Sequence, residues 1–293
     1  MSPMITGNKN KWLTLLLTSL LIGVAVFFMN TKMTQSEKGH PTSATLFVHG
    51  YKGGQKSFGP MIERFETMNE NSNHMLIYVH DNGKLAFKTP LSKGQHTFIQ
   101  LLFENNRASL DQQTKWLQSV MYELKQSYHI DQIQLVGHSM GGMAAVKYLM
   151  NNQSPRYPSV EKLAVIASPF GGIRKKGYFN KNYGAALEDL KPGSAAQQNF
   201  IKRKQRLDQE VDVLAIAGVI NKSEAPYDHW DGLVHLDSVK KLKSIISKEQ
   251  YEEEIIYGID ATHSGLHEHP TVDRVLQDFL WKNSEYEKSV HGY

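Results

Sequence analysis

Cysteine is absent from this sequence of 293 residues. The chain therefore forms no disulfide and has no site for lipoprotein-type acylation. An excess of one charge is also absent, because the net charge is only +4 at pH 7. A balance this mild, without any recognition motif, argues against a nucleic-acid partner. No aspartate-rich loop of the calcium-binding type appears, and we expect no cofactor.

Long hydrophobic runs are scarce, with one exception near the N-terminus. Residues 12–29 carry no charge over 18 positions, which is close to the shortest length that spans a bilayer. Lys9 and Lys11 precede the run, and no small-residue cleavage site follows it. We expect residues 1–30 to be an uncleaved signal anchor, with a cleaved signal peptide as the alternative. Either alternative predicts an extracytoplasmic protein, anchored in the cell membrane or secreted.

Beyond a polar tether at 31–43, the pattern of hydrophobic residues predicts a single α/β domain over 44–284, followed by a tail at 285–293. Short continuous apolar runs alternate with longer helical patterns, as in a buried, mostly parallel sheet flanked by helices. The sequence predicts strands at 45–48, 75–79, 98–103, 132–136, 162–167, 211–217 and 254–257. It predicts helices at 57–68, 109–127, 140–151, 236–247 and 271–282.

The most informative motif is Gly137-His138-Ser139-Met140-Gly141. It follows an apolar strand and precedes a helical pattern, which is the context of a nucleophile elbow. A serine on such a turn has a strained backbone, and glycines two residues away on either side avoid steric collisions. The motif therefore predicts that Ser139 is a nucleophile rather than an ordinary helix cap.

An acid and a histidine follow in the chain order Ser, Asp, His. Asp231 lies in an Asp-Gly-x-Val turn after one predicted strand, and His263 lies in a loop after the next. The carboxyl ends of parallel strands meet at one edge of a sheet, so these residues are expected beside Ser139. Two alternates remain open, Asp228 for the acid and His267 for the base. The histidines lack the second ligand cluster that a metal site needs, so we expect no metal.

These motifs resemble the α/β-hydrolase superfamily and, more narrowly, the Gram-positive cell-surface hydrolases known as domain of unknown function 915. The resemblance covers roughly residues 44–282. It is carried by Phe47-Val48-His49-Gly50, by the elbow with Gly142, by Asp231-Gly232-Leu233-Val234, and by His263-Ser264-Gly265-Leu266-His267-Glu268. It implies an α/β-hydrolase fold and hydrolysis without naming a substrate. It also implies that the long basic stretch 173–210 is an insert that covers the active site as a cap.

The remaining candidate residues concern the oxyanion hole and the pocket. Two main-chain N–H groups should stabilise the oxyanion, one from Met140 and one from Tyr51 in the turn that contains His49 and Gly50. Phe170 lies in a Ser-Pro-Phe-Gly-Gly segment that resembles a pocket-lining segment of related lipases. A simple strand-ending turn is an equally good interpretation of that segment.

The function predicted from these residues is a serine hydrolase that cleaves carboxylic esters through an acyl-enzyme on Ser139. His263 would act as base and Asp231 would orient it. The basic insert suggests an anionic substrate, such as a lipid or an acylated wall polymer, with Lys202, Arg203 and Lys204 as the residues to test. The alternatives are an acyltransferase with the same triad and a non-catalytic binding protein on a hydrolase frame.

Overall fold

The computed structural model describes residues 43–68, 72–88, 96–151, 154–207, 210–221 and 229–281. The expected signal anchor at 1–30, the tail at 285–293 and all but the last residue of the tether at 31–43 lie outside these ranges. Asp228 lies outside them as well. Across the ranges that are described, no helix is both long and apolar enough to cross a membrane.

An eight-stranded sheet forms the centre of the domain, with the order β3-β2-β4-β1-β5-β6-β7-β8. All neighbouring strands are parallel except β2 and β3, which are antiparallel. The strands are β1 (Ser43–Val48), β2 (Ser72–Val79), β3 (Leu85–Lys88), β4 (His96–Phe103), β5 (Gln132–His138), β6 (Ser159–Ile166), β7 (Asp212–Val219) and β8 (Tyr251–Tyr257). The predicted α/β architecture with a mostly parallel sheet is confirmed. The short edge strand β3 was not predicted.

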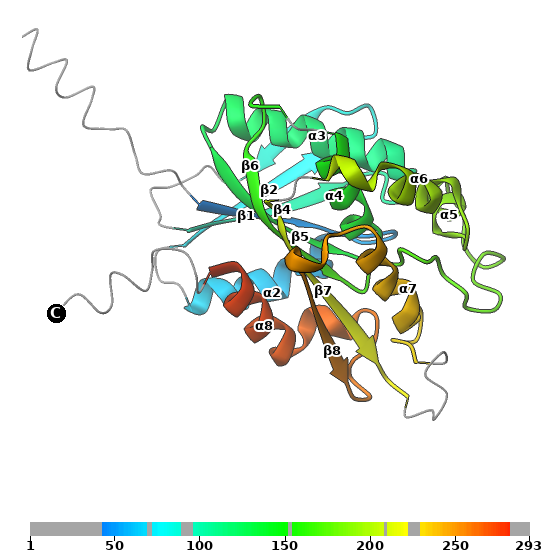
Figure 1. The fold of residues 1–293 in the computed structure, drawn as a ribbon. Helices are drawn as coiled ribbons and strands as arrows, with labels where there is room; N and C mark the ends of the chain where they lie inside the picture. Colours follow the sequence, from blue (N-terminus) through cyan, green and yellow to red (C-terminus); the bar gives the residue numbers. More distant parts are fainter. Residues whose placement is uncertain are drawn as a thin grey trace, which may run out of the picture. The chain divides into compact units, whose positions relative to one another are not determined.

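Helices connect the strands and cover both faces of the sheet (Figure 1). The α-helices are α2 (Gln55–Met68), α3 (Leu110–Gln126), α4 (Met140–Asn151), α5 (Ala186–Leu190), α6 (Ala195–Arg203), α7 (Leu236–Lys240) and α8 (Pro270–Trp281). Short 3₁₀ turns are η1 (Lys204–Arg206), η3 (Lys241–Ser244), η4 (Lys248–Gln250) and η5 (Gly265–Glu268). The predicted helix at 236–247 is too long. It tightens into η3, where the N–H groups of Ile245 and Ile246 both donate to Leu242 O, and this turn lets all three side chains reach the core.

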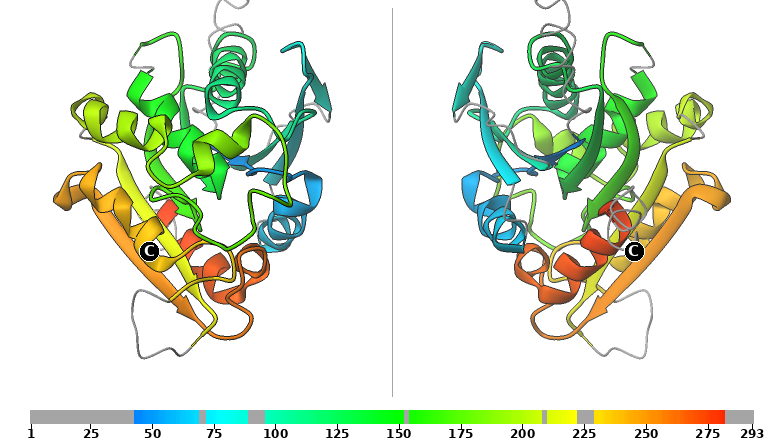
Figure 2. Two further views of the ribbon diagram at one scale, coloured as in Figure 1. Left: turned by 90° about the vertical axis from the view of Figure 1, so that its right-hand side faces the viewer. Right: turned by 90° about the vertical axis from the view of Figure 1, so that its left-hand side faces the viewer.

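The alternation of side chains along each strand divides the core into two layers. In β1, Leu46 and Val48 join a cluster with residues of α3 and α4, whereas Phe47 joins a cluster with residues of α2 and α8. The views in Figures 1 and 2 show these helices on opposite faces of the sheet. Side chains of successive strand residues point to opposite faces, so a sheet covered on both sides needs continuous apolar strands.

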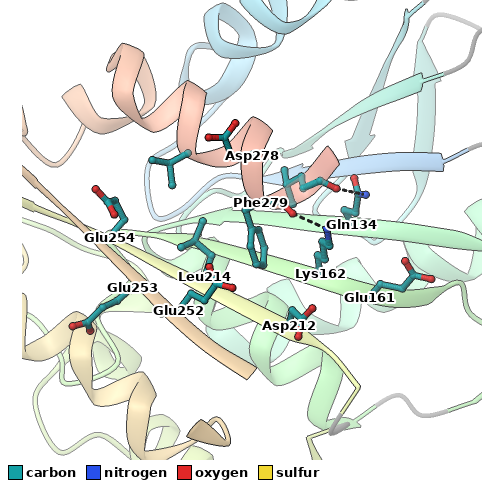
Figure 3. Close-up of a pocket in the computed structure, with 12 residues that line it drawn as sticks. Gln134, Glu161, Lys162, Asp212, Leu214, Glu252, Glu253, Glu254, Asp278 and Phe279 are labelled. Atoms are coloured by element: carbon teal, nitrogen blue, oxygen red, sulfur yellow. Dashed lines mark hydrogen bonds between the residues drawn. The ribbon is translucent and has the colours of Figure 1, made fainter. Parts of the chain in front are cut away.

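A groove lies on the α8 side of the sheet, near the amino-terminal ends of β6, β7 and β8 (Figure 3). Its volume is about 410 Å³. Six of the residues that line it are acidic: Glu161, Asp212, Glu252, Glu253, Glu254 and Asp278. Lys162 Nζ also lies there and donates a hydrogen bond to Phe279 O at 2.7 Å. This groove is at the edge of the sheet opposite to the predicted catalytic residues.

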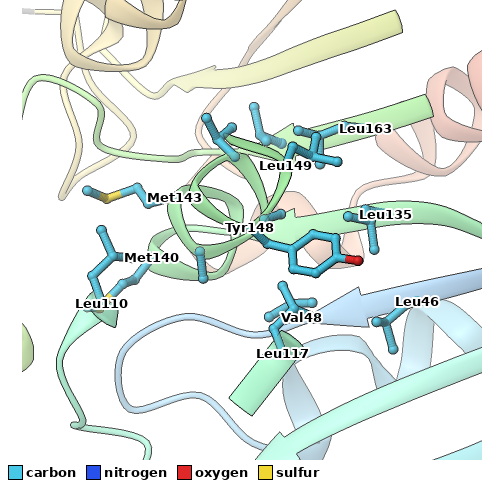
Figure 4. Packing of buried hydrophobic residues seen from close by; sticks show 14 of the residues in the cluster. Leu46, Val48, Leu110, Leu117, Leu135, Met140, Met143, Tyr148, Leu149 and Leu163 are labelled. Carbon is cyan, nitrogen blue, oxygen red and sulfur yellow. The ribbon is translucent and has the colours of Figure 1, made fainter. Parts of the chain in front are cut away.

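Helix α4 follows Ser139 and is almost entirely buried. Tyr148 lies in the core with Leu46, Val48 and Leu135 around it (Figure 4). Burying one large apolar side chain stabilises a fold by roughly 1.5–3 kcal/mol. The turn that carries Ser139 is therefore held between a central strand and a tightly packed helix.

Candidate active site

Ser139 occupies a strained turn between β5 and α4. Its φ angle is +54°, a left-handed conformation that is uncommon for a residue with a side chain. A Cβ on Gly137 would lie 2.5 Å from Gly142 Cα, and a Cβ on Gly141 would collide with Val48 O. Both glycines are thus needed for steric reasons at the positions that the motif indicated.

His263 and Asp231 form a hydrogen-bonded pair. The ring Nδ1–H of His263 donates to Asp231 Oδ2 at 2.8 Å. The other carboxylate oxygen accepts the N–H groups of Leu233 at 2.8 Å and Val234 at 2.7 Å. Asp231 is 1% exposed, so a charged carboxylate there depends on these three donors. Because Nδ1 is engaged with the carboxylate, Nε2 of His263 is the ring atom left for a proton transfer.

His138 connects this pair to the elbow. Its Nε2–H donates to the main-chain oxygen of His263 at 2.8 Å, and the two ring centroids are 4.7 Å apart. Burial lowers the pKa of His138 well below its usual range, so the ring is neutral. The residue before Ser139 therefore holds the loop that carries the histidine. The sequence placed His138 in the elbow but gave no sign of a contact with a residue 125 positions away.

The alternate base, His267, lies one turn further on, in η5. Its ring packs edge-on against His138 with centroids 5.1 Å apart, and it also faces Phe58. Burial lowers the pKa of His267. Asp231 contacts His263 and not His267, so the observed pairing favours His263 as the base.

The turn after β1 packs directly against the elbow. A Cβ on Gly50 would lie 2.8 Å from Ser139 Cβ and 3.0 Å from Met140 N. His49 fixes this turn, because its Nε2 accepts the N–H of Phe103 at 3.1 Å and its Nδ1–H therefore donates to Gly50 O at 2.9 Å. Burial lowers the pKa of His49 to about 4, so the ring stays neutral in this role.

Tyr51 has two separate roles in this turn. Its main-chain N–H makes no hydrogen bond with any other residue that the structure describes, as the predicted oxyanion donor requires. Its hydroxyl contacts the insert, donating to Tyr183 O at 2.7 Å and accepting the Tyr183 N–H at 3.2 Å. The neighbouring Lys52 Nζ donates to Asn182 Oδ1 at 2.8 Å. The side chains of this turn therefore anchor the insert.

The start of the insert contacts the turn that carries the acid. Lys175 Nζ donates to Gly232 O at 2.8 Å and lies over the ring of Trp230, 5.4 Å from its centroid. Residues 175–183 of the insert thus run from the turn of Asp231 to the turn of Tyr51. Its later part forms α5 and α6, and the side chain of Ser194 caps the start of α6.

A cavity of about 600 Å³ that is open to solvent lies between the insert and the His263–Asp231 pair. Residues of three segments line it: Lys175, Lys176, Gly177, Tyr178, Lys181 and Asn182 from the insert, Ile220, Asp231, Gly232 and Leu233 from the acid side, and Thr262, His263 and Ser264 from the histidine loop. The sequence did not indicate which residues of the insert line this cavity. The only signal was the general excess of lysine, and it pointed to Lys202, Arg203 and Lys204, which do not line this cavity.

Two further predictions concern Phe170 and metals. Phe170 is 3% exposed and packs against Phe200 with ring centroids 5.6 Å apart. It does not line the cavity beside His263, and its contact with a substrate stays a prediction. Within the described ranges, no group of three or more histidine, aspartate or glutamate residues could hold a metal ion.

Comparison with known proteins gives relatives of the same fold. The product of the gene lin2722 of Listeria innocua is 29% identical, with a TM-score of 0.70 over 82% of this chain and 94% of that one. A protein of Lactobacillus plantarum inferred to be a cell surface hydrolase is 19% identical, with a TM-score of 0.63 over 83% and 92% of the two chains. The mature lipase BlEst2 of Bacillus licheniformis is 15% identical, with a TM-score of 0.52 over 82% and 94%.

No sequence among the curated proteins matches the chain. A family model, described as an alpha/beta hydrolase of unknown function (DUF915), matches residues 32–283. The match includes the elbow, the acid turn and the histidine loop. The chain therefore belongs to the DUF915 family of alpha/beta hydrolases.

Proposed function

We propose that the protein is a serine hydrolase that cleaves carboxylic esters, with Ser139 as nucleophile, His263 as base and Asp231 as the acid that orients it. The observation that carries this proposal is the His263–Asp231 hydrogen bond of 2.8 Å beside a serine with φ of +54°. The hydrogen bond of His138 to the main chain of His263 supports a short distance between the turn of Ser139 and the loop of His263. A buried carboxylate, a histidine and a strained serine are the constellation that activates a hydroxyl for attack.

The reaction proceeds through two acyl transfers, first to Ser139 and then to water. Ser139 Oγ attacks the carbonyl carbon while its proton moves to His263 Nε2, and Asp231 stabilises the resulting imidazolium. The N–H groups of Met140 and Tyr51 donate to the oxyanion. The bond to the alcohol oxygen then breaks as His263 returns the proton to that oxygen. A water molecule repeats the sequence on the acyl-serine, releasing the carboxylic acid and restoring Ser139.

The insert at 173–210 acts as a cap in this proposal, because it is tied to the turns of both Tyr51 and Asp231. Enclosing the reaction reduces competition from bulk water and strengthens the electrostatic interactions. The name of the Bacillus licheniformis neighbour, a lipase, agrees with an ester substrate. The name of the Lactobacillus plantarum neighbour, together with the apolar run at 12–29, supports action outside the cytoplasmic membrane.

Turnover of simple esters by the full-length protein tests this proposal. A panel of glycerol and nitrophenyl esters from acetate to octanoate would be assayed with the wild type, Ser139→Ala, His263→Ala and His267→Ala. We expect loss of roughly 10³-fold or more with the first two variants, and a smaller loss with His267→Ala. Full activity of Ser139→Ala would contradict the proposal. An alcohol acceptor added to the assay separates hydrolysis from acyl transfer, because transfer yields a new ester in place of free acid.

A further inference from the structure

The cavity beside His263 has an unusual charge distribution. Its lining contains three lysines, Lys175, Lys176 and Lys181, and one carboxylate, Asp231. That carboxylate is 1% exposed and already accepts hydrogen bonds from His263 and two main-chain N–H groups. It is therefore not available to neutralise the lysines. The charge that faces the open space of the cavity is positive.

The lysines are held differently. All three are exposed, and Lys175 is held by its hydrogen bond to Gly232 O. Lys176 and Lys181 have no carboxylate partner among the residues that the structure describes. Asn182 holds the segment next to Lys181, since its Nδ2 donates to Tyr178 O at 2.8 Å and its Oδ1 accepts from Lys52. Ammonium groups on long flexible stems, carried by an anchored segment, suit the binding of a phosphate or carboxylate.

The position of the cavity indicates which half of an ester it would hold. His263 lines the cavity, but Ser139 and the turn of Tyr51 do not. In the proposed reaction His263 donates its proton to the leaving alcohol oxygen, so the alcohol part must extend past this ring. The acyl part stays on Ser139, beside the oxyanion donors. A group in the cavity therefore belongs to the alcohol half.

We infer that the substrate is an ester whose alcohol part carries an anionic group, a phosphate or a carboxylate, and that Lys175, Lys176 and Lys181 bind that group. This inference rests on the proposed function. It differs from a general attraction of anions by the basic insert, because it assigns the binding to three lysines of one cavity. It also assigns the charge to the alcohol and not to the acid that is released.

Three matched esters test the assignment. 1-Butyrylglycerol is neutral, 1-butyrylglycerol 3-phosphate carries its charge on the alcohol, and 1-succinylglycerol carries it on the acyl group. The full-length wild type is compared with Lys176→Gln/Lys181→Gln. We expect KM for the phosphate ester to rise about tenfold, because the variant removes two exposed cationic partners of the phosphate. KM for the other two esters should change less than twofold. For the wild type, added salt should narrow the difference in KM between the phosphate ester and the neutral ester.

Lys202→Gln/Lys204→Gln is the control, since it removes the same charge from α6 and η1 of the same insert without altering the cavity lining. An equal rise in KM with this control, or an equal rise for the neutral ester, overturns the inference. If hydrolysis of the neutral ester depends on Ser139 but the lysine variant leaves KM for the phosphate ester unchanged, the inference is overturned and the proposed function stands. Hydrolysis that persists in Ser139→Ala overturns the proposed function.

The anionic alcohol could reach the cavity as a soluble molecule or as a lipid headgroup. The same variants are therefore assayed on vesicles of phosphatidylcholine with and without phosphatidylglycerol. A lysine effect with both the soluble phosphate ester and the anionic vesicles supports a lipid source, and an effect with the soluble ester alone supports a soluble source. An absence of any lysine effect in both assays contradicts the inference.

Discussion

The two edges of the sheet carry hollows of comparable size but different chemistry. At the amino ends of β6–β8 six acidic residues are among those that line a groove of about 410 Å³ (Figure 3). At the carboxyl ends a cavity of about 600 Å³ contains lysines, His263 and Asp231. The acidic groove is lined mainly by charged residues near the starts of the strands. The basic cavity contains the hydrogen-bonded pair of Asp231 and His263 and lies beside the strained turn of Ser139.

The difference shows that the size and charge of a hollow do not identify an active site. In a parallel sheet every loop at the carboxyl edge follows a strand, so a few residues on neighbouring loops can be brought together. The strain at Ser139 and the close approach of Gly50 are stored at this edge, where a rigid strand and helix can maintain them. Changes at the two edges should therefore differ sharply in their effect on activity.

The largest expected effect comes from removing one charge at each edge. Asp231→Asn should lower kcat by roughly 10³–10⁴-fold, because the amide favours the wrong tautomer of His263. Asp278→Asn removes a carboxylate of the acidic groove and should change kcat less than twofold. Both are measured with the same neutral ester. Comparable losses in the two variants would break the distinction between the edges.

A glycine substitution tests the steric part of the comparison. A Cβ on Gly141 collides with the main chain at Val48, whereas a Cβ on Gly54 meets nothing within 4 Å. Gly141→Ala should lower the free energy of unfolding by about 3 kcal/mol or more and reduce activity. Gly54→Ala, at the last residue before α2, should leave both nearly unchanged. Urea denaturation gives the stability of each variant, and an ester assay gives its activity. A stable and active Gly141→Ala protein would contradict the steric account of the elbow.

Acid should destabilise both edges through buried histidines. Burial lowers the pKa of His49, at the carboxyl edge, and of His96, at the amino edge, to about 4. The unfolded chain binds protons at each position near pH 6.5, so stability is fully present above that pH and is lost as pH falls toward 4. Each histidine should account for about 3 kcal/mol over this window.

The variant His96→Gln separates this effect from catalysis. Its loss of stability between pH 7 and pH 4.5, measured by urea denaturation, should be smaller than that of the wild type, while its activity at pH 7 stays the same. An unchanged pH dependence of stability would show that His96 is not a source of acid sensitivity.

The smallest expected effect concerns the side chain of Tyr51. Tyr51→Phe removes the two hydrogen bonds to Tyr183 but keeps the main-chain donor. We expect kcat to fall less than tenfold, since the lost hydrogen bonds anchor the insert and do not involve the proposed reacting atoms. Amide exchange around Asn182 should become faster, which would show loosening of the insert. A loss as large as that of Ser139→Ala would mean that the phenol takes part in the chemistry.

Much of this architecture is readable from the sequence because local patterns agree with the fold. The apolar runs predicted seven of the strands, and G-x-S-x-G predicted the strained serine. The edge strand β3 was missed because Leu85-Ala86-Phe87-Lys88 is only four residues long and mostly half-buried. The predicted helix at 236–247 was too long because burial of Leu242, Ile245 and Ile246 favours a tighter turn.

The site was predictable to the level of residue types but not of contacts. Chain order indicated Ser139, Asp231 and His263. The hydrogen bond from His138 to the main chain of His263 joins residues 125 positions apart and has no local sequence signal. The choice among the basic residues of the insert depended on how the insert folds, which a count of charges does not contain. The catalytic roles of all the candidate residues stay predictions: Ser139, Asp231, His263, Tyr51, Met140, Gly137, Gly141, His49, Gly50 and Phe170.

The most direct test of the central claim is covalent labelling of Ser139 by a fluorophosphonate. The intact full-length protein is treated with the probe, and its mass and the modified peptide are determined for the wild type, His263→Ala and Ser139→Ala. The account predicts one adduct on Ser139 in the wild type, strongly slowed labelling in His263→Ala and none in Ser139→Ala. A folded wild type that remains unmodified, or an adduct on a different serine, would contradict it.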